Sequence, residues 1–480
     1  MILDFVEKRE DIILAVSIIL FAWLRIPYLF QESLWNDETV YMWMGQKILE
    51  NPAFLLTSHP AHHSYGYLFS ILTAVLNLFL PIFYSARIVT LLFSVMNGVL
   101  LYLIGKKMMN KYAGLAAMLL LGFNGLHIFI TDRALLDVPI TAMFTAMMAA
   151  LVYFDPDSIK SGILLGATTL LSILTKTSGM LTVPIVGLAL IAMYPDIKAI
   201  RKEGIIACFA TLVASGLFLV INNLFHFGRI SSEPIGDFLR TIVFSGSPTF
   251  YIENASLIYS TPLFILALIG MYMALSGDRE SRAVVIATLV YFLFFSFVIS
   301  EKVPRYGLPI LPGIIILAVC AVNKVVEKLE LPSYAILAIL VLGYFAYQPA
   351  NSLLSQRAIT YTGFQETGEL VAELDGQENF ETIYAQSVRQ IRTFSGIDFK
   401  NDGGRISGLP VNFSDLENQS NILLQIDVWE YSAPSWVYPL DQAKLDAILA
   451  ANFSLTHAVQ RDYPTQQGLQ KVPVGFLLVR

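Results

Sequence analysis

Charge is scarce in this sequence. Only 14% of its 480 residues are Asp, Glu, Lys or Arg, whereas 55% are hydrophobic. An average soluble domain carries about 25% charged residues. A chain of this length with so little charge is too apolar for a soluble protein, so the composition indicates a polytopic membrane protein.

Cysteines and basic stripes are scarce as well. The two cysteines, Cys208 and Cys320, both fall inside apolar segments, which excludes a disulfide framework. The net charge is -6 and no basic stripe runs along the chain, so we expect no nucleic-acid partner. The first apolar segment lacks a small-residue cleavage site and continues into residues 23–27, which favours an uncleaved anchor over a removable signal peptide.

Long apolar runs are abundant, and a spanning helix needs about 20 apolar residues. We expect about eleven spans, at residues 12–30, 88–105, 112–130, 138–154, 161–175, 178–194, 204–224, 257–275, 283–300, 306–322 and 333–347. After about Tyr347 the composition becomes ordinary and apolar and polar residues alternate, as in residues 422–426. The sequence therefore predicts a mostly α fold with a transmembrane domain over residues 1–349 and a small soluble α/β domain over residues 350–480.

The basic residues predict the topology. Lys8 and Arg9 precede the first span and place the N-terminus in the cytoplasm by the positive-inside rule. The later basic clusters are cytoplasmic as well only if the apolar segment 65–83 does not cross, so we interpret that segment as a juxtamembrane or re-entrant helix. The C-terminal domain then lies outside, as do the loops that hold Asp37, Asp132, Lys176 and Lys302.

Two adjacent carboxylates, Asp37 and Glu38, follow the first predicted span. They are candidates for acid–base chemistry; the alternative is a helix start with Asp37 as N-cap and Glu38 in the first turn. His59, His62 and His63 follow in the same loop. Imidazole and carboxylate both bind metals, but this spacing matches no compact motif. We expect no metal, with a divalent ion as the alternative, and we assign His59 to substrate phosphate or to a helix cap.

Charged residues also mark the loop after the third span. Asp132 and Arg133 lie there, and either bind substrate or form an ion pair at the membrane rim. Asp137 precedes the next span, and Pro139 falls in its first turn, where a missing backbone donor does no harm. Asp137 is therefore a candidate for the site, with a helix cap as the alternative.

Three cations lie in the later outward loops. Lys176 interrupts an apolar run, and the alternative to a functional role is that it snorkels to the interface. Lys302 and Arg305 lie on the side where the positive-inside rule disfavours cations, which indicates anion binding. The alternative is ordinary helix flanking, with Glu301 neutralising Lys302.

The order of these loops resembles that of the GT-C glycosyltransferases, over roughly residues 10 to 320. The matching features are the pair Asp37 and Glu38, His59 with Pro60, Arg133-x-x-x-Asp137-x-Pro139, Thr175 with Lys176, and Arg305-Tyr306-x-x-Pro309. The nearest branches are the protein O-mannosyltransferases and lipid A aminoarabinose transferases of family 39. Ala61 departs from the pattern, because it replaces the second proline of the usual pair, and this leaves the substrate open.

This resemblance implies an inverting glycosyltransferase that moves a sugar from a polyprenyl-phosphate donor to a protein, lipid or glycan acceptor. The phosphate leaving group is already anionic, so the reaction needs one base and several cations but no general acid. The implied roles are Asp37 as base; Glu38, Asp132 and Asp137 in orienting the reactants; Arg133, Lys176, Lys302, Arg305 and His59 on the donor phosphate; and Tyr41, His62 and Tyr306 on the substrate, without a cofactor.

Two other functions are compatible with a polytopic membrane chain. A transporter or flippase of a lipid-linked anion would carry ionisable residues near the bilayer midplane. Here the centres of the predicted spans are almost free of charge, and the charges gather at one rim. A non-catalytic scaffold whose outer domain binds a partner is the third interpretation. We expect an enzyme integral to the cell membrane, with its active site and C-terminal domain extracytoplasmic.

Overall fold

The computed structural model describes residues 10–29, 34–56, 67–196, 202–227, 247–299, 302–337, 339–340, 363–397, 405–409, 419–427, 448, 450, 452–465 and 468–480. The chain divides into two compact units. Met1–Leu29 and Ile48–Leu354 form the first unit, and Phe30–Lys47 with Ser355–Arg480 form the second. The segment that contains Asp37 thus groups with the C-terminal part of the chain. The predicted domain division after residue 349 stays a prediction.

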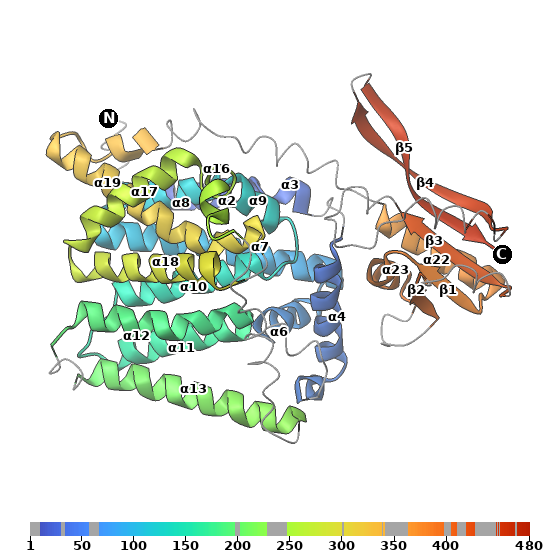
Figure 1. Cartoon of the computed structure of the whole chain (residues 1–480), viewed down its shortest axis with the longest axis horizontal. Helices are drawn as coiled ribbons and strands as arrows, with labels where there is room; N and C mark the ends of the chain where they lie inside the picture. Colours follow the sequence, from blue (N-terminus) through green and yellow to red (C-terminus); the bar gives the residue numbers. More distant parts are fainter. Residues whose placement is uncertain are drawn as a thin grey trace. The chain divides into compact units, whose positions relative to one another are not determined.

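Helices build the first unit (Figure 1). They are α2 (Glu10–Trp23), α3 (Ile26–Leu29), η1 (Pro52–Leu56), α6 (Tyr67–Leu76), α7 (Ile82–Met108), α8 (Lys111–Gly122), α9 (Gly125–Thr131), α10 (Asp137–Val152), α11 (Ile159–Thr175), η2 (Thr177–Leu181), α12 (Thr182–Met193), α13 (Glu203–Phe227), α15 (Phe250–Glu253), α16 (Ala255–Ile258), α17 (Thr261–Leu275), α18 (Arg279–Phe297), η4 (Pro304–Ile310) and α19 (Leu311–Lys328). The mostly α fold that the sequence predicts is confirmed.

Three helical stretches in the described residues are long and apolar enough to cross a membrane: Ile82–Met108, Arg279–Phe297 and Pro304–Lys328. The pair α8 and α9, bent by 62°, makes a fourth if it is one broken span. Several other apolar helices are shorter, between 10 and 17 residues. The number of eleven spans stays a prediction, and its last span, residues 333–347, falls partly outside the described residues.

Helix α6 occupies the apolar segment that the sequence analysis interprets as not crossing. It has ten residues, which at 1.5 Å per residue gives about 15 Å, half the thickness of a bilayer core. Asn77 ends the helix by donating its N–H to the Thr73 carbonyl, and Pro81 then precedes α7. Because of its length, α6 cannot span the membrane alone.

Glycines let several helices of the first unit approach closely. A Cβ atom on Gly105 of α7 would lie 2.8 Å from the Gly114 Cα of α8, and one on Gly270 of α17 would lie 1.9 Å from the Leu317 carbonyl oxygen of α19. Lipid gives helices little hydrophobic reason to associate, so such close backbone packing supplies the attraction instead.

A buried arginine fixes the break between α8 and α9. Arg25, which is fully buried, donates to the carbonyls of Phe21 (2.7 Å) and Gly122 (3.2 Å) and contacts Nδ1 of His127 at 3.0 Å. The Asn124 side chain caps α9 by accepting from the N–H of His127. Carbonyls at a helix C-terminus have no partner in their own helix, so the guanidinium satisfies the end of α8 and sets the direction of α9.

The second unit contains a five-stranded mixed sheet with the order β2-β1-β3-β5-β4 (Figure 1). Its strands are β1 (Thr382–Ala385), β2 (Ile406–Gly408), β3 (Ile422–Asp427), β4 (Ser454–Thr465) and β5 (Gly468–Val479). β1 pairs in parallel with β2 and β3, whereas β5 pairs antiparallel with β3 and β4. The α/β character predicted for the C-terminal region is confirmed.

Both faces of this sheet carry apolar residues. On one face, α22 (Phe364–Glu378) and α23 (Val388–Ser395) pack through Val371 and Ile391 against Ile383 and Leu423. On the other face, Leu424 and neighbouring residues form a second cluster. Because side chains alternate along a strand, Gln425 and Asp427 point to the same face as Leu423, the one that the two helices cover.

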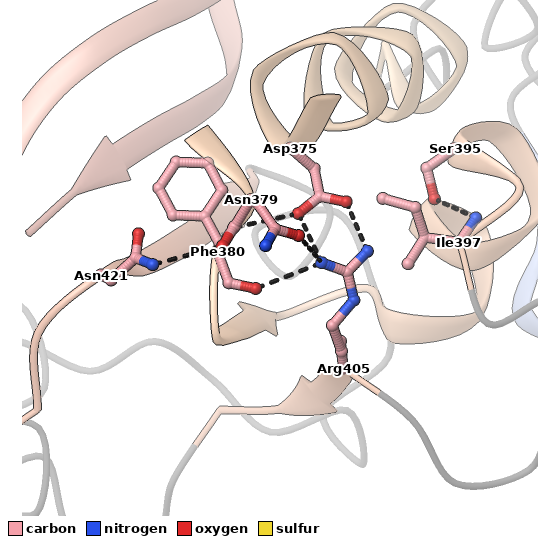
Figure 2. A network of polar contacts seen from close by, with 7 residues as sticks. All are labelled: Asp375, Asn379, Phe380, Ser395, Ile397, Arg405 and Asn421. Atoms are coloured by element: carbon pink, nitrogen blue, oxygen red, sulfur yellow. Dashed lines mark hydrogen bonds and ion pairs between the residues drawn. The ribbon is translucent and has the colours of Figure 1, made fainter. Parts of the chain in front are cut away.

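A charged network closes the amino edge of the parallel strands (Figure 2). Arg405, directly before β2, donates to both carboxylate oxygens of Asp375 at 2.9 and 2.5 Å and to the Phe380 carbonyl at 3.2 Å. Asp375 also accepts from the N–H of Phe380, and the Asn421 amide donates to the Asn379 carbonyl. Such a two-pronged arginine–carboxylate pair combines geometric specificity with charge, and here it ties α22 to the starts of all three parallel strands.

Candidate active site

The site in the first unit begins at the first residue of α10. Asp137 lies in the first turn of that helix, where the helix dipole favours a negative charge. Leu136, which precedes the helix, supplies no capping side chain, and Thr141 donates its hydroxyl to the Asp137 carbonyl at 2.6 Å. The carboxylate is almost wholly buried, with 5% of its side chain exposed. A buried carboxylate requires compensating charge.

Two cations from distant parts of the chain supply that charge. Lys176 Nζ lies 2.8 Å from Oδ1 of Asp137, and Arg305 Nε lies 3.7 Å from Oδ2. Lys176 has an extended backbone at the junction of α11 and η2, and Arg305 comes from η4. We call Lys176 and Arg305 the cation pair. Together with the one negative charge of Asp137, their two positive charges give a net charge of +1. Their side chains remain partly accessible, at 24% for Lys176 and 15% for Arg305.

An aromatic column lies beside the cation pair. Lys176 Nζ lies 4.7 Å from the centre of the Tyr306 ring, a distance at which the ring face attracts a cation. Tyr306 meets Phe295 edge-on, and Phe295 stacks on Tyr291 at 4.6 Å. The sequence analysis missed Tyr291 and Phe295, because aromatic residues four apart in an apolar helix have the same pattern as ordinary core residues.

Asp137 and Lys176 lie just outside the predicted spans. Burial opposes the charged form of Asp137, but the charges of Lys176 and Arg305 and the hydrogen bond from Lys176 outweigh it and lower the pKa of the carboxyl. Burial likewise opposes the charged form of Lys176, but Asp137 raises the pKa of the amine. The carboxylate loses its stabilising effect only as the pH falls through a depressed pKa, and the amine only as the pH rises through an elevated one. Asp137 and Lys176 therefore both stay ionised around neutral pH.

Lys302 lies at the end of α18. Its Nζ donates to the carbonyls of Phe295 (2.5 Å) and Ser296 (2.8 Å) and lies 6.0 Å from the Tyr251 ring centre. Burial lowers the pKa of this amine. A cation that donates to the last carbonyls of a helix stabilises its C-terminus, so Lys302 flanks the end of α18, in line with the helix-flanking alternative of the sequence analysis.

Asp132 and Arg133 lie at the end of α9 and are both fully buried. The Arg133 guanidinium donates to the Phe129 carbonyl at 2.5 Å and lies 3.8 Å from the Phe129 ring centre. These contacts hold Arg133 against its own helix. The backbone N–H of Asp132 donates to the carbonyls of Ile128 and Ile130 and thereby ends α9.

Asp37 and Glu38 lie in the first turn of α4 (Asn36–Glu50), within the second unit. Glu38 is fully buried, and its Oε1 accepts from the N–H of Trp35 at 2.9 Å. This is the reach-back contact of a capping box. Glu38 in the first turn thus agrees with the helix-start alternative, whereas Asp37 is the second residue of α4 rather than its N-cap and is half-buried. Tyr41, one turn further, is buried.

His59 and His62 fall outside the described residues. Within the part of the chain that the structure describes, no three His, Cys, Asp or Glu side chains form a cluster that could hold a metal ion. Of the predicted residues, Asp137, Lys176, Arg305 and Tyr306 come together, although they are spread over 170 residues of sequence. Their arrangement can bind an anionic group between two cations and an aromatic ring.

Several solved structures are similar to this chain. ArnT from Cupriavidus metallidurans in the apo state matches with a TM-score of 0.62 and 14% identity over 98% of both chains. The Archaeoglobus fulgidus oligosaccharyltransferase matches with a TM-score of 0.61 and 13% identity over 98% of this chain and 75% of that one. Arabinofuranosyltransferase AftD from mycobacteria gives a TM-score of 0.57 and 13% identity over 98% of this chain and 39% of that one. At these identities the likeness shows a shared fold.

No curated protein matches the sequence. The sequence profile of the Alg9-like mannosyltransferase family, by contrast, matches residues 15–393, which is more than half of the chain. The matching family is thus a mannosyltransferase family other than the two branches to which the motifs point. The prediction of a GT-C membrane glycosyltransferase, made against the transporter and scaffold alternatives, is confirmed. The chain belongs to the Alg9-like mannosyltransferase family of GT-C membrane glycosyltransferases.

Proposed function

We propose that the protein transfers a mannosyl residue from a polyprenyl-phosphate donor to a hydroxyl group of an acceptor. The observation that carries the proposal is the cation pair on Asp137 beside Tyr306. Proteins with the same fold bind such lipids: one ArnT structure contains undecaprenyl phosphate, and one structure of archaeal AglB contains a dolichol-phosphate. The family supplies the sugar class, and the family and the fold together supply the donor class.

Each residue then has a chemical role in one displacement. The acceptor oxygen attacks the anomeric carbon opposite the phosphate, so the product has the inverted configuration. The bond between the anomeric carbon and the phosphate oxygen breaks, and the polyprenyl phosphate leaves with the electron pair. The acceptor proton passes to the carboxylate of Asp37. Lys176 and Arg305 hold the phosphate oxygens, whose negative charge grows as the bond breaks.

Asp137 would act in this proposal as the resident counterion of the cation pair. Without it, two cations with little exposure would repel each other before the donor arrives. Arg305 offers a planar fork to the phosphate and Lys176 offers a point charge. Since Asp137 and Lys176 stay ionised around neutral pH, binding of the donor phosphate should vary little between about pH 6 and 8.

Arg305→Ala tests the donor site. The loss of one charge-assisted hydrogen bond costs about 1.5 to 3 kcal/mol, so KM for a purified polyprenyl-phosphate mannose should rise roughly ten- to hundred-fold. Arg279→Ala is the matched control, because Arg279 in α18 is exposed and pairs with its sequence neighbour Glu280. A folded Arg305→Ala variant with the donor KM of the wild type would remove Arg305 from the donor site.

The proposed topology has about eleven spans, a cytoplasmic N-terminus and an external C-terminal domain. Single cysteines replace two exposed residues, Lys107 in the last turn of α7 and Glu378 of α22. The background has serine at the buried Cys208 and Cys320. In intact cells, a membrane-impermeant maleimide should label Glu378→Cys and spare Lys107→Cys until the membrane is permeabilised. Labelling of Lys107→Cys alone would reverse the proposed orientation.

A further inference from the structure

A polar cluster lies at the carboxyl edge of the parallel strands of the second unit. Gln425 and Asp427 belong to β3, Gln386 and Ser387 follow β1 directly, and Gln390 lies in the first turn of α23. Gln425, Asp427 and Gln390 are 0%, 2% and 3% exposed. None of these residues takes part in the proposed transfer. Three polar side chains so deeply buried in a small domain require either internal partners or a ligand.

Hydrogen bonds within the cluster orient the side chains of Gln425 and Asp427. Gln425 Oε1 accepts from the backbone N–H groups of Gln386 (3.1 Å) and Ser387 (3.3 Å), and its Nε2 donates to Asp427 Oδ2 at 2.9 Å. The backbone N–H of Asp427 donates to Gln386 Oε1 at 3.0 Å. These bonds fix the turn between β1 and α23 and hold the Asp427 carboxylate in one orientation. A carboxylate that an amide side chain holds in place is a preorganised hydrogen-bonding group.

The same edge retains unused hydrogen-bonding capacity. Gln386 Nε2 is buried and has no partner among the described residues. The side chain of Ser387 makes no capping bond at the start of α23. Gln390 is nearly buried, and its side chain makes no hydrogen bond within the described ranges. The amino edge of the same strands is different, because Arg405 and Asp375 close it with a completed network (Figure 2).

The topology supports a ligand at the carboxyl edge. The chain passes from β1 through α23 to β2 on one side, and β3 lies on the other side of β1. In open α/β sheets, ligands bind outside the carboxyl ends of the strands where the strand order reverses, and the local order 2-1-3 is one of the arrangements that do so. The polar cluster lies between β1 and β3, at that point.

We propose that this edge of the second unit binds a carbohydrate, and that, given the proposed function, this carbohydrate is part of the acceptor. A carboxylate accepts hydrogen bonds from hydroxyl groups, and the amides of Gln386 and Gln390 donate to hydroxyl oxygens. The negative charge of Asp427 opposes phosphate and carboxylate ligands. A neutral sugar with neighbouring hydroxyl groups satisfies the unused donors, and a buried donor that gains a partner no longer carries the cost of lost hydration.

Gln390→Leu tests this site in the full-length protein, because leucine has a similar volume and no hydrogen-bonding atoms. Saturation-transfer NMR with methyl α-D-mannopyranoside should detect binding to the wild type and about ten-fold weaker binding to the variant, the effect of one lost hydrogen bond. Gln377→Leu, at an exposed position of α22, should bind as the wild type does. In transfer assays, Gln390→Leu should raise the acceptor KM and leave the donor KM unchanged.

The carbohydrate site and the proposed function are tested by different outcomes. No saturation transfer to the wild type, or equal transfer to wild type and Gln390→Leu, overturns the carbohydrate site even if the enzyme uses its donor normally. Binding that depends on Gln390, without transfer from any polyprenyl-phosphate mannose, supports the site and refutes the donor. Ser387→Ala serves as the second variant if Gln390→Leu does not fold, because the Ser387 hydroxyl makes no capping bond, and it should weaken the same signal.

Discussion

Asp37→Asn should lower the rate of mannosyl transfer by about 10²- to 10⁴-fold, the usual contribution of a positioned base. Asparagine keeps the size of the side chain but cannot accept the proton of the acceptor. The half-buried Asp37 leaves the helix-capping contact to Glu38, which accepts from Trp35. The start of α4 should therefore survive the substitution, and expression and thermal stability should change little.

Transfer is measured with a purified polyprenyl-phosphate mannose, and donor binding is measured in parallel without acceptor. Donor binding should remain, because the phosphate is assigned to Lys176 and Arg305. Glu50→Gln, at the exposed last position of α4, is the control for removing one carboxylate from the same helix. Near-normal turnover by Asp37→Asn would transfer the role of base to Asp132 or Asp137. A variant that no longer folds would return Asp37 to a structural role at the helix start.

Local sequence patterns predicted the elements of the fold more successfully than its contacts. The alternating apolar and polar residues 422–426, which indicated a soluble α/β domain, lie in β3 (Ile422–Asp427). Strand β2 has only three residues, too few for a period-two pattern to show. Helix α23 was missed because its eight residues include two arginines, a glutamine and two hydroxyl residues, which read as a loop in a single sequence.

The charged residues show why a site is harder to predict than an element. The positive-inside rule marked Lys302 and Arg305 equally, yet Lys302 donates to the end of α18 while Arg305 approaches Asp137. The difference arises from the turn of η4, which places two residues three positions apart against different helices. Likewise, Glu38 and Asp37 are adjacent in sequence, but only Glu38 accepts from the N–H of Trp35. Tertiary geometry, which no local pattern encodes, decides the case of Lys302 and Arg305, whereas the Glu38 contact is a local capping bond.

Asp137→Asn should destabilise the protein without ligand and make it more dependent on lipid phosphate. Removal of one member of a buried charge cluster costs about 3–5 kcal/mol. The lower end of that range is expected here, because 24% of the Lys176 side chain remains exposed. The amide cannot neutralise Lys176 and Arg305, so the cluster changes from a net charge of +1 to +2. An anionic ligand should then bind more tightly to the variant than to the wild type.

Denaturation in detergent, with and without polyprenyl phosphate, measures both effects. A ligand at one hundred times its Kd stabilises a protein by about 2.7 kcal/mol, and the gain should be larger for Asp137→Asn than for the wild type at the same lipid concentration. Asp375→Asn is the matched control, because it also leaves an arginine, Arg405, without its buried carboxylate, but in the second unit. It should lose stability that the lipid does not restore. Equal rescue of the two variants would mean that the lipid acts on the whole protein, and Lys176 and Arg305 would then lose their assignment as the phosphate site.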